Sequence, residues 1–393
     1  MEYRSNPKNG DKLSVLGFGC MRFPRGLNTR IDLDKTEELI LTALEAGVNY
    51  FDTAYTYGGS EVTLGEILAK NQAREKIFLA TKLPYRQCQV YEDFDRLFKV
   101  QLERLNSDYF DYYLIHNISA SNLWENLCEL GIERWIAEKK ANGQIRQIGF
   151  SFHGPQNNFL DLLDAYKWDF CQIQYNYLNE NYQAGRLGLQ KAHEKGLPVI
   201  IMDPLLGGKL ANGLPRPSQK LFYETNPSLS SAAWALRWLW DQPEVTVVLS
   251  GMNSLEQLID NISSAEGALP GVLTEKEAAV YTAVVADLQK TYKIPCTGCN
   301  YCMPCPHKVN IPGCFAAYNA SYATGFVTGM QQYITSTGAN HLKKDYSGRN
   351  CMQCGKCEKA CPQHIGIIKS LQTATRRMEP FWFKALMKIV SKK

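Results

Sequence analysis

The sequence lacks the features of a membrane, exported or nucleic-acid-binding protein. Apolar residues make up 45% of the 393 positions, yet no stretch approaches the roughly 18 consecutive apolar residues that suggest a membrane span. The segment from Met1 to Asn9 is polar and has no apolar run typical of a signal peptide. The formal net charge is only +4, too small to indicate a nucleic-acid partner. We therefore expect a cytoplasmic protein with no transmembrane segment.

A dinucleotide-binding motif is also missing. No Gly-x-Gly-x-x-Gly follows the first predicted strand, which lies within Leu13 to Phe18, and this argues against a Rossmann domain. Short apolar strands and amphipathic helices instead alternate about eight times along the chain. This pattern predicts an α/β protein with a (β/α)₈, or TIM, barrel, and a doubly wound open sheet is the alternative.

The end of the barrel is indicated by one more helix and a proline. Thr274 to Thr291 has helical periodicity, with Thr274 as N-cap and Glu277 three residues on, a capping-box pattern. Ile294-Pro295 then marks a boundary, so we expect a barrel over residues 1–293 and a second domain over 294–393. Within the barrel, Asn122 to Ala141 is predicted to be one long helix.

Polar residues end three of the predicted strands. Asp52 follows the strand Val48 to Phe51, with Tyr57 in the next loop, and Lys82 and His116 end two later apolar runs. In a parallel barrel these strand ends open onto one face, so the four side chains meet in one pocket. A cation beside a phenol stabilises phenolate and lowers its pKa from about 10, while imidazole can orient a carbonyl oxygen. The four residues therefore predict a proton-donating site.

This order of residues resembles the aldo-keto reductase family over about the first three-quarters of the chain. The family's tetrad is an Asp and a Tyr after the second strand, a Lys after the third and a His after the fourth, which correspond here to Asp52, Tyr57, Lys82 and His116. The resemblance implies an oxidoreductase that transfers hydride between NAD(P)H and a small-molecule carbonyl or alcohol, with Tyr57 as general acid. A barrel that retains the site without using it is the alternative.

The same resemblance implies a cofactor site at the ends of the later strands. Ser151 and Gln174 match residues that hold the nicotinamide carboxamide, the turn Asp203 to Lys209 matches the pyrophosphate loop, and the turn after the last strand matches the adenosine-phosphate site. The implied residues are Ser151, Gln174, Asp203, Leu205, Gly208, Lys209, Ser250, Gly251, Asn253, Gln257 and Asn261.

Two departures from the family pattern bear on the choice of cofactor. Many members have Ser-Asn after strand five, where this chain has Ser151-Phe152-His153. NADPH-specific members place a lysine and an arginine around the 2′-phosphate, where this chain has Gly251 and Gln257. Without these cations the 2′-phosphate has little to pair with, so NADH is expected to bind at least comparably to NADPH unless another cation, such as Lys209, takes over.

Thirteen cysteines point to metal binding rather than to disulfides, because neither a signal sequence nor a short chain is present. Eight fall in two runs near the C-terminus, and Cys20, Cys88, Cys128, Cys171 and Cys314 are scattered. The second run has the Cys-x₂-Cys-x₂-Cys-x₃-Cys-Pro spacing of bacterial [4Fe–4S] ferredoxins. Zinc is the alternative, but zinc ribbons use two separated knuckles. The predicted ligands are Cys296, Cys299, Cys302, Cys305, Cys351, Cys354, Cys357 and Cys361.

The resemblance to two-cluster ferredoxins extends to the ligand pattern. In those domains the cysteine before proline ligates the other run's cluster, so Cys361 would join the first run and Cys305 the second. The first run has one residue fewer before its last cysteine, which makes Cys314 an alternative ligand. We expect a mostly helical dicluster ferredoxin-like domain with two [4Fe–4S] clusters, followed by a basic amphipathic segment from Ser370 to Lys393.

Three functions follow from combining the two domains. The barrel reduces carbonyls while the clusters are structural. Alternatively, the clusters feed electrons to a flavin or a substrate at the barrel mouth, because hydride carries two electrons and a cluster passes one; a redox partner protein would then supply them. The third alternative is a redox-responsive binding subunit with a vestigial barrel site.

Overall fold

The computed structural model describes residues 1–26, 30–323, 325–337 and 345–380 of the chain. These residues form two compact units. The first comprises Met1–Leu205 and Ala232–Leu273, and the second comprises Leu206–Ser231 and Thr274–Lys393. Residues 206–231 and 274–293 therefore belong to the same compact unit as the C-terminal residues. The sequence pattern instead predicts a domain boundary at residue 294.

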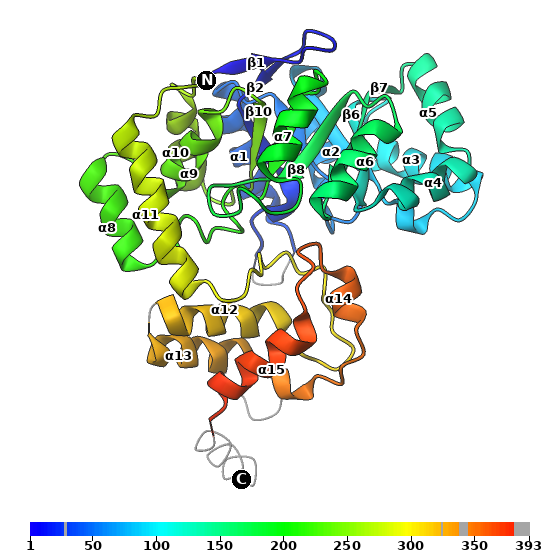
Figure 1. Cartoon of the computed structure of the whole chain (residues 1–393). Coiled ribbons are helices and arrows are strands. Elements are labelled where there is room, and N and C mark those ends of the chain that lie inside the picture. Colours follow the sequence, from blue (N-terminus) through cyan, green and yellow to red (C-terminus); the bar gives the residue numbers. More distant parts are fainter. Residues whose placement is uncertain (27–29, 324, 338–344, 381–393) are drawn as a thin grey trace. The chain divides into compact units, whose positions relative to one another are not determined.

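Eight parallel strands close into a barrel in the first unit (Figure 1). The order around the barrel is β10-β3-β4-β5-β6-β7-β8-β9, so chain neighbours pair and the last strand closes on the first. This confirms the predicted (β/α)₈ fold and excludes the open sheet. The barrel strands are β3 Leu16–Gly19, β4 Tyr50–Asp52, β5 Phe78–Leu83, β6 Phe110–Ile118, β7 Ile145–Phe152, β8 Phe170–Gln174, β9 Val199–Met202 and β10 Val245–Ser250.

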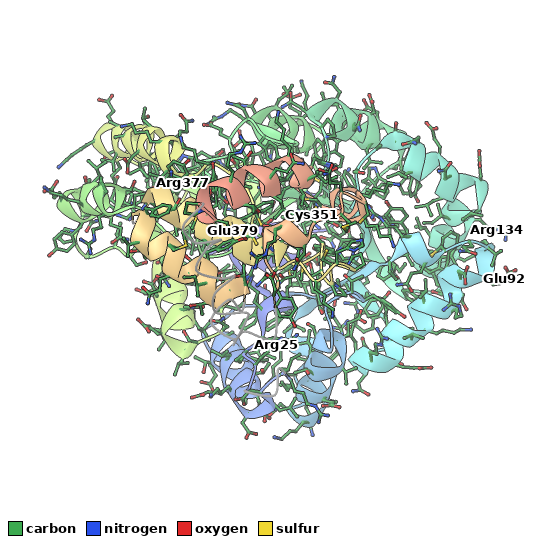
Figure 2. All side chains as sticks on the ribbon, turned by 90° about the horizontal axis from the view of Figure 1, so that it is seen from below. Arg25, Glu92, Arg134, Cys351, Arg377 and Glu379 are labelled. Atoms are coloured by element: carbon green, nitrogen blue, oxygen red, sulfur yellow. The ribbon has the colours of Figure 1, made fainter. Side chains whose placement is uncertain are left out.

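Helices surround the barrel and bury their apolar faces against the strands. The exposed side of this layer carries charged residues such as Glu92 and Arg134, which lie at the periphery in Figure 2. The helices are α1 Leu33–Glu45, α2 Ser60–Lys70, α3 Tyr91–Leu105, α4 Ser121–Glu129, α5 Ile132–Ala141, α6 Gln156–Ala165, α7 Gly185–Glu194, α9 Ser231–Trp240 and α10 Leu255–Ala265, with short 3₁₀ turns η1 Cys20–Arg22, η2 Arg74–Lys76 and η3 Tyr85–Gln87.

The single helix predicted over Asn122 to Ala141 is wrong, because the chain breaks it into α4 and α5. Gly131 lies at the break with φ of 91°, a left-handed conformation that glycine adopts without steric cost. Apolar periodicity continues across the break, which explains why the sequence pattern read as one helix.

A hairpin lies at the start of the first unit. β1 Tyr3–Ser5 pairs antiparallel with β2 Lys12–Ser14, and the loop between them contains Asn9-Gly10. Tyr112 of β6 is fully buried; its hydroxyl donates to Asp11 Oδ2 at 2.8 Å and accepts from Asn6 Nδ2 at 3.0 Å. The hairpin therefore contacts an inward-facing barrel residue near the amino end of β6.

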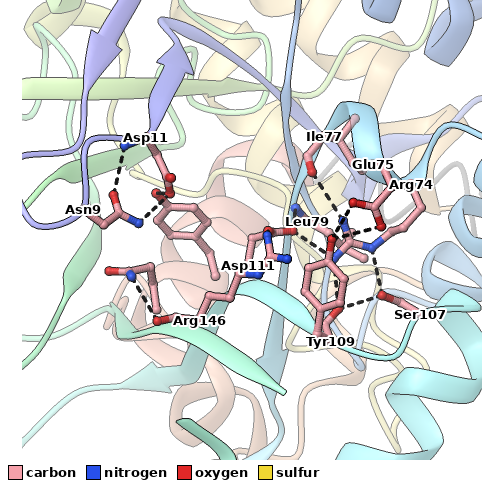
Figure 3. A network of polar contacts seen from close by, with 12 residues as sticks. Asn9, Asp11, Arg74, Glu75, Ile77, Leu79, Ser107, Tyr109, Asp111 and Arg146 are labelled. Atoms are coloured by element: carbon pink, nitrogen blue, oxygen red, sulfur yellow. Dashed lines mark hydrogen bonds and ion pairs between the residues drawn. The ribbon is translucent and has the colours of Figure 1, made fainter. Parts of the chain in front are cut away.

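The amino ends of β6 and β7 are held by a buried carboxylate (Figure 3). Asp111 accepts hydrogen bonds from Arg74 and from Arg146, each at 2.9 Å, and from the Leu79 backbone N–H at 2.9 Å. All of these contacts lie at the end of the barrel opposite the carboxyl ends of the strands. Polar networks on that face of a (β/α)₈ barrel serve stability rather than chemistry.

The second unit is helical in its described residues. Helix α11 begins with the predicted capping box, in which the Thr274 and Glu277 side chains each accept the other's backbone N–H. Cys314, Phe315 and Tyr333 are fully buried in this unit's core. Its elements are α8 Arg216–Thr225, which the sequence pattern missed, α11 Glu275–Thr291, α12 Ile311–Ala323, α13 Phe326–Thr337, η4 Gly348–Asn350, α14 Lys356–Ala360 and α15 Ile367–Met378.

The predicted C-terminal amphipathic segment is described only in part. Helix α15 covers its beginning, and residues 381–393 lie outside the described residues. Across the described chain, every helix is too short or too polar to cross a membrane.

Candidate active site and cysteine centres

The barrel brings the four predicted catalytic residues to the carboxyl ends of adjacent strands. Asp52 ends β4, Lys82 is the penultimate residue of β5, and His116 lies near the end of β6. Tyr57 is half-buried in the loop between β4 and α2. Because β4 pairs with β5 and β5 with β6, side chains far apart in sequence meet on one face.

Lys82 is fully buried and its ammonium group is fixed by two oxygen atoms. Its Nζ donates to Asp52 Oδ1 at 2.5 Å and to the Thr53 carbonyl at 2.7 Å. Gln172 of β8 donates to the other oxygen of Asp52 at 2.9 Å. The carboxylate therefore has a partner on each oxygen, which a buried charge requires.

Tyr57 lies between the lysine and the histidine. Lys82 Nζ is 5.1 Å from the centroid of the Tyr57 ring. The ring centroids of Tyr57 and His116 are 5.9 Å apart, with an edge-to-face angle of 86°. A phenol in this position has a cation on one side and an imidazole on the other, the arrangement that proton donation to a carbonyl oxygen needs.

His116 is held in its neutral form. Burial is the main reason that the pKa of His116 lies well below its ordinary value, and the positive charge of Lys82, together with His153 and Arg86, lowers it further. Thr56 Oγ1 lies 3.5 Å from Nδ1 of the ring. A neutral imidazole can donate one hydrogen bond to a substrate oxygen without adding a charge.

Two predicted nicotinamide residues lie at neighbouring strand ends. Ser151 of β7 accepts the Asn117 backbone N–H at 2.7 Å. Gln174 at the end of β8 is buried, and neither its Oε1 nor its Nε2 has a hydrogen-bond partner among the described residues. A buried, unpaired amide is costly, so it is expected to be satisfied by a ligand. A carboxamide offers one acceptor and two donors, which suits both atoms.

The predicted phosphate turn joins β10 to α10. Asn261 donates to Ser250 Oγ at 2.8 Å, and both side chains are buried. Ser254 is the N-cap of α10, where its hydroxyl accepts from Gln257 N at 3.3 Å. Gln257 in turn accepts the Asn253 N–H at 3.1 Å through Oε1. Gln257 thus stabilises the turn itself, and Gly251 supplies no side chain.

The loop after β9 divides between the two units. Asp203 and Leu205 belong to the first, where the Asp203 carbonyl accepts from Asn176 Nδ2 at 3.2 Å. Gly208 and Lys209 belong to the second. There Lys209 Nζ donates to the Cys296 carbonyl and to the Tyr292 hydroxyl, so the lysine already has oxygen partners.

In the second unit, cysteines from both runs line one cavity. Cys296, Cys299 and Cys302 of the first run meet Cys361 of the second, with apolar walls from Ile311, Phe315 and neighbouring residues. Burial, and to a smaller extent the nearby Cys296, Cys299 and Cys361, raise the pKa of the Cys302 thiol to about 12. Such thiols keep their protons until a metal replaces them.

The two runs share the same left-handed backbone positions. Left-handed residues flank the second cysteine of each run, Gly298 and Asn300 around Cys299, and Gln353 and Gly355 around Cys354. The same turn also follows the last cysteine of each run. Lys308 is left-handed, with its N–H on the Cys305 carbonyl, and His364 matches it after Cys361. Cys305 is therefore the structural equivalent of Cys361 despite the shorter spacing.

Cys314 lies elsewhere. It is fully buried in the core of the second unit and is not part of the cavity wall, although Ile311 and Phe315 of the same helix are. Burial raises its pKa to about 12. Within the described structure, no two of the thirteen cysteines form a disulfide bond.

The spacing of the cysteines bears on the choice of metal. Ligands of a single zinc ion stand about 2.3 Å from it, hence within about 4 Å of one another. Among the described residues, no three cysteine, histidine or acidic side chains approach closely enough to hold one metal ion. The cavity is lined by four thiols, Cys296, Cys299, Cys302 and Cys361, and cysteine thiolates are the ligands that hold an iron–sulfur cluster.

Two family models match the chain and do not overlap. Residues 15–271 match the aldo/keto reductase family, and residues 295–366 match the 4Fe-4S dicluster domain. The first match covers more than half of the chain, so this protein belongs to the aldo/keto reductase family. The predicted resemblance is thereby confirmed, as is the assignment of the chain as an oxidoreductase with an iron–sulfur domain.

Individual relatives agree with this assignment. The chain is 27% identical to "Uncharacterized oxidoreductase YrpG" of Bacillus subtilis, over 68% of this chain and 92% of the relative. It is 25% identical to "NADH-specific methylglyoxal reductase" of Escherichia coli, over 64% and 90%. Among solved structures, the holo form of aldo-keto reductase AKR11C1 from Bacillus halodurans is 26% identical, with a TM-score of 0.59 over 72% of this chain and 96% of that one.

Sequence reasoning missed several residues of the site. Gln172 was detectable, because in the run Phe170-Cys171-Gln172-Ile173-Gln174 it shares the face of Gln174, and a polar residue is unusual in a buried strand. His153 and Gln183 are both buried, with His153 Nδ1 3.1 Å from Gln183 Oε1. No spacing in the sequence links those two residues.

Proposed function

We propose that the barrel reduces the carbonyl group of a small molecule to an alcohol, and catalyses the reverse reaction, with Tyr57 as general acid. The observation that carries the proposal is the fixed position of Lys82, bonded to Asp52 and Thr53 and 5.1 Å from the Tyr57 ring. NAD(P)H, when bound, supplies the hydride that such a reduction needs.

Each residue of the tetrad has a separate task in this proposal. The Tyr57 hydroxyl donates its proton to the carbonyl oxygen as negative charge develops there. Lys82 stabilises the phenolate that remains, and Asp52 holds the lysine in place with help from Gln172. His116, kept neutral by burial, donates a hydrogen bond that orients the carbonyl oxygen.

The nicotinamide cofactor has suitable partners in the same unit. The unpaired amide of Gln174 and the hydroxyl of Ser151 would hold its carboxamide. The phosphates and ribose of the cofactor would be held by Asp203, Leu205 and the turn that contains Ser250, Gly251, Asn253, Gln257 and Asn261. For Gly208 and Lys209, the family resemblance implies a place in the pyrophosphate loop.

The test is Tyr57→Phe, with Tyr55→Phe as the matched control in the same loop. General acids contribute about 10²–10⁴-fold to turnover, so Tyr57→Phe should lower kcat by that factor while the Kd for dinucleotide stays the same. Tyr55 lies under the Arg104 guanidinium at 4.3 Å and should tolerate the change. Near-normal carbonyl reduction by Tyr57→Phe would refute the proposal.

We further propose two [4Fe–4S] clusters with exchanged fourth ligands. The cavity lined by the first run and Cys361 supports the first, with Cys296, Cys299, Cys302 and Cys361 as ligands. The left-handed positions that the two runs share support Cys351, Cys354, Cys357 and Cys305 for the second. Such clusters supply one-electron transfer when present. Cluster ligands must stay reduced, which favours a cytoplasmic location.

A further inference from the structure

The turn after β10 lacks a cation of its own, and an arginine from the turn that follows β3 packs over it. A Cβ built on Gly251 would lie 3.3 Å from Arg22 Cδ, 3.4 Å from its Cβ and 3.5 Å from its Cγ. The aliphatic stem of Arg22 therefore covers the Gly251 backbone. A side chain at position 251 would compete for this space.

Strand pairing explains how Arg22 reaches this position. β3 pairs with β10 with Phe18 opposite Ser250, and the 3₁₀ turn Cys20–Arg22 follows β3 directly. Gly19 allows close approach, since a Cβ there would be 3.3 Å from the Ser250 carbonyl oxygen. The position of Arg22 is thus determined by the closure of the barrel.

The guanidinium of Arg22 is available for a ligand. It makes no hydrogen bond or ion pair with any residue in the described part of the chain, although its side chain is half-buried. Burial raises the pKa of the Asp203 carboxyl, and the Arg22 charge opposes that rise, so the two side chains interact at longer range. A guanidinium that no protein group engages can pair with an anion, and its planar fork suits a phosphate.

The other positions from which the sequence predicts a phosphate-binding cation do not supply one. The positions that carry the phosphate-binding cations in NADPH-specific relatives are Gly251 and Gln257, and Gln257 is bonded to Asn253. Lys209, the substitute suggested by the sequence, donates to Cys296 and Tyr292 within the second unit.

We propose that Arg22 binds the 2′-phosphate of NADP(H), replacing the cation that Gly251 cannot supply. The inference rests on the proposed nicotinamide-dependent function. It reverses the expectation from the sequence that NADH binds at least as well as NADPH. Arginine suits this role because its planar guanidinium can donate two parallel hydrogen bonds to a phosphate.

The experiment is calorimetric titration of the full chain with NADP⁺ and with NAD⁺, which measures binding without turnover. Wild type should bind NADP⁺ more tightly. Arg22→Ala should weaken NADP⁺ binding about 10- to 100-fold, the range of a hydrogen bond to a charged group, and change NAD⁺ binding less than about threefold. Arg22→Lys should keep part of the preference. Arg96→Ala, which removes an exposed arginine paired with Asp93 on α3, is the charge-matched control.

A second variant tests the replacement itself. In the double variant Arg22→Ala/Gly251→Lys, the loss of the Arg22 side chain leaves room for a lysine at position 251. This lysine should restore most of the NADP⁺ affinity. Equal loss of NAD⁺ and NADP⁺ affinity in Arg22→Ala would place the arginine on the pyrophosphate and overturn the inference. Unchanged NADP⁺ binding would also overturn it while leaving the proposed function intact. Failure of wild type to bind either dinucleotide would overturn both.

Discussion

The ammonium of Lys82 donates a 2.5 Å hydrogen bond to Asp52 Oδ1, and both side chains are almost fully buried. This pair joins β4 to β5 at the carboxyl ends of the strands, and it lies beside Tyr57. Structure and proposed chemistry therefore depend on the same contact.

Removing one partner of this pair should cost both stability and activity. Lys82→Met leaves the Asp52 carboxylate buried with Gln172 as its remaining side-chain donor, so unfolding should become easier by about 3–5 kcal/mol. Carbonyl reduction should fall as well, because Tyr57 loses its neighbouring cation. Chemical denaturation and steady-state rates measure the two effects. Lys70→Met, which removes an exposed lysine paired with Glu37, is the control and should change neither quantity appreciably.

His116 should make the stability depend on pH. Its pKa is depressed in the folded state, so below about pH 6.5 the unfolded chain binds a proton that the folded chain excludes. The contribution of this residue is present above that pH and is lost as the pH falls, with a slope of at most about 1.4 kcal/mol per pH unit. The difference between wild type and His116→Gln, measured by denaturation from pH 7.5 to 5, isolates this slope. Parallel curves would show that His116 takes up a proton in the folded chain.

The cysteine assignment can be tested without destroying a cluster. Serine retains an oxygen ligand and shifts the reduction potential of the cluster it binds. Under the exchanged arrangement, Cys302→Ser and Cys361→Ser should shift the same spectroscopic signal, and Cys357→Ser and Cys305→Ser the other. Redox titration followed by electron paramagnetic resonance makes the comparison. Cys314→Ala should leave both signals in place; loss of one would identify Cys314 as a ligand in place of Cys305.

The opposite end of the barrel should affect stability alone. Asp111→Ala leaves Arg74 without its buried carboxylate, which should cost about 3–5 kcal/mol of unfolding free energy. The folded fraction should keep its kcat, because Asp111 lies at the amino end of β6 and His116 near the carboxyl end. Thermal denaturation and rates at low temperature separate the two quantities. A lower kcat in fully folded enzyme would show that the two ends are coupled.

Much of the fold was predictable because the signals were local. Strand ends at Asp52, Lys82 and His116 follow from apolar runs with a polar residue at the end, and these residues lie at or near the ends of β4, β5 and β6. The capping box at Thr274 was likewise visible in four residues. The break between α4 and α5 was missed because a left-handed glycine leaves the apolar periodicity intact.

The sequence by itself determined which residues are available: the four predicted catalytic side chains in order, eight cysteines at ferredoxin spacing, and a turn at Gly251 without a cation. Only the tertiary structure decided which of these residues contact one another. Barrel closure set Arg22 over Gly251, strand register aimed Gln172 at Asp52, and helix packing brought Cys361 to the cavity of the first run. Each of these contacts joins residues tens to hundreds of positions apart, and such pairings depend on packing that local periodicity does not encode.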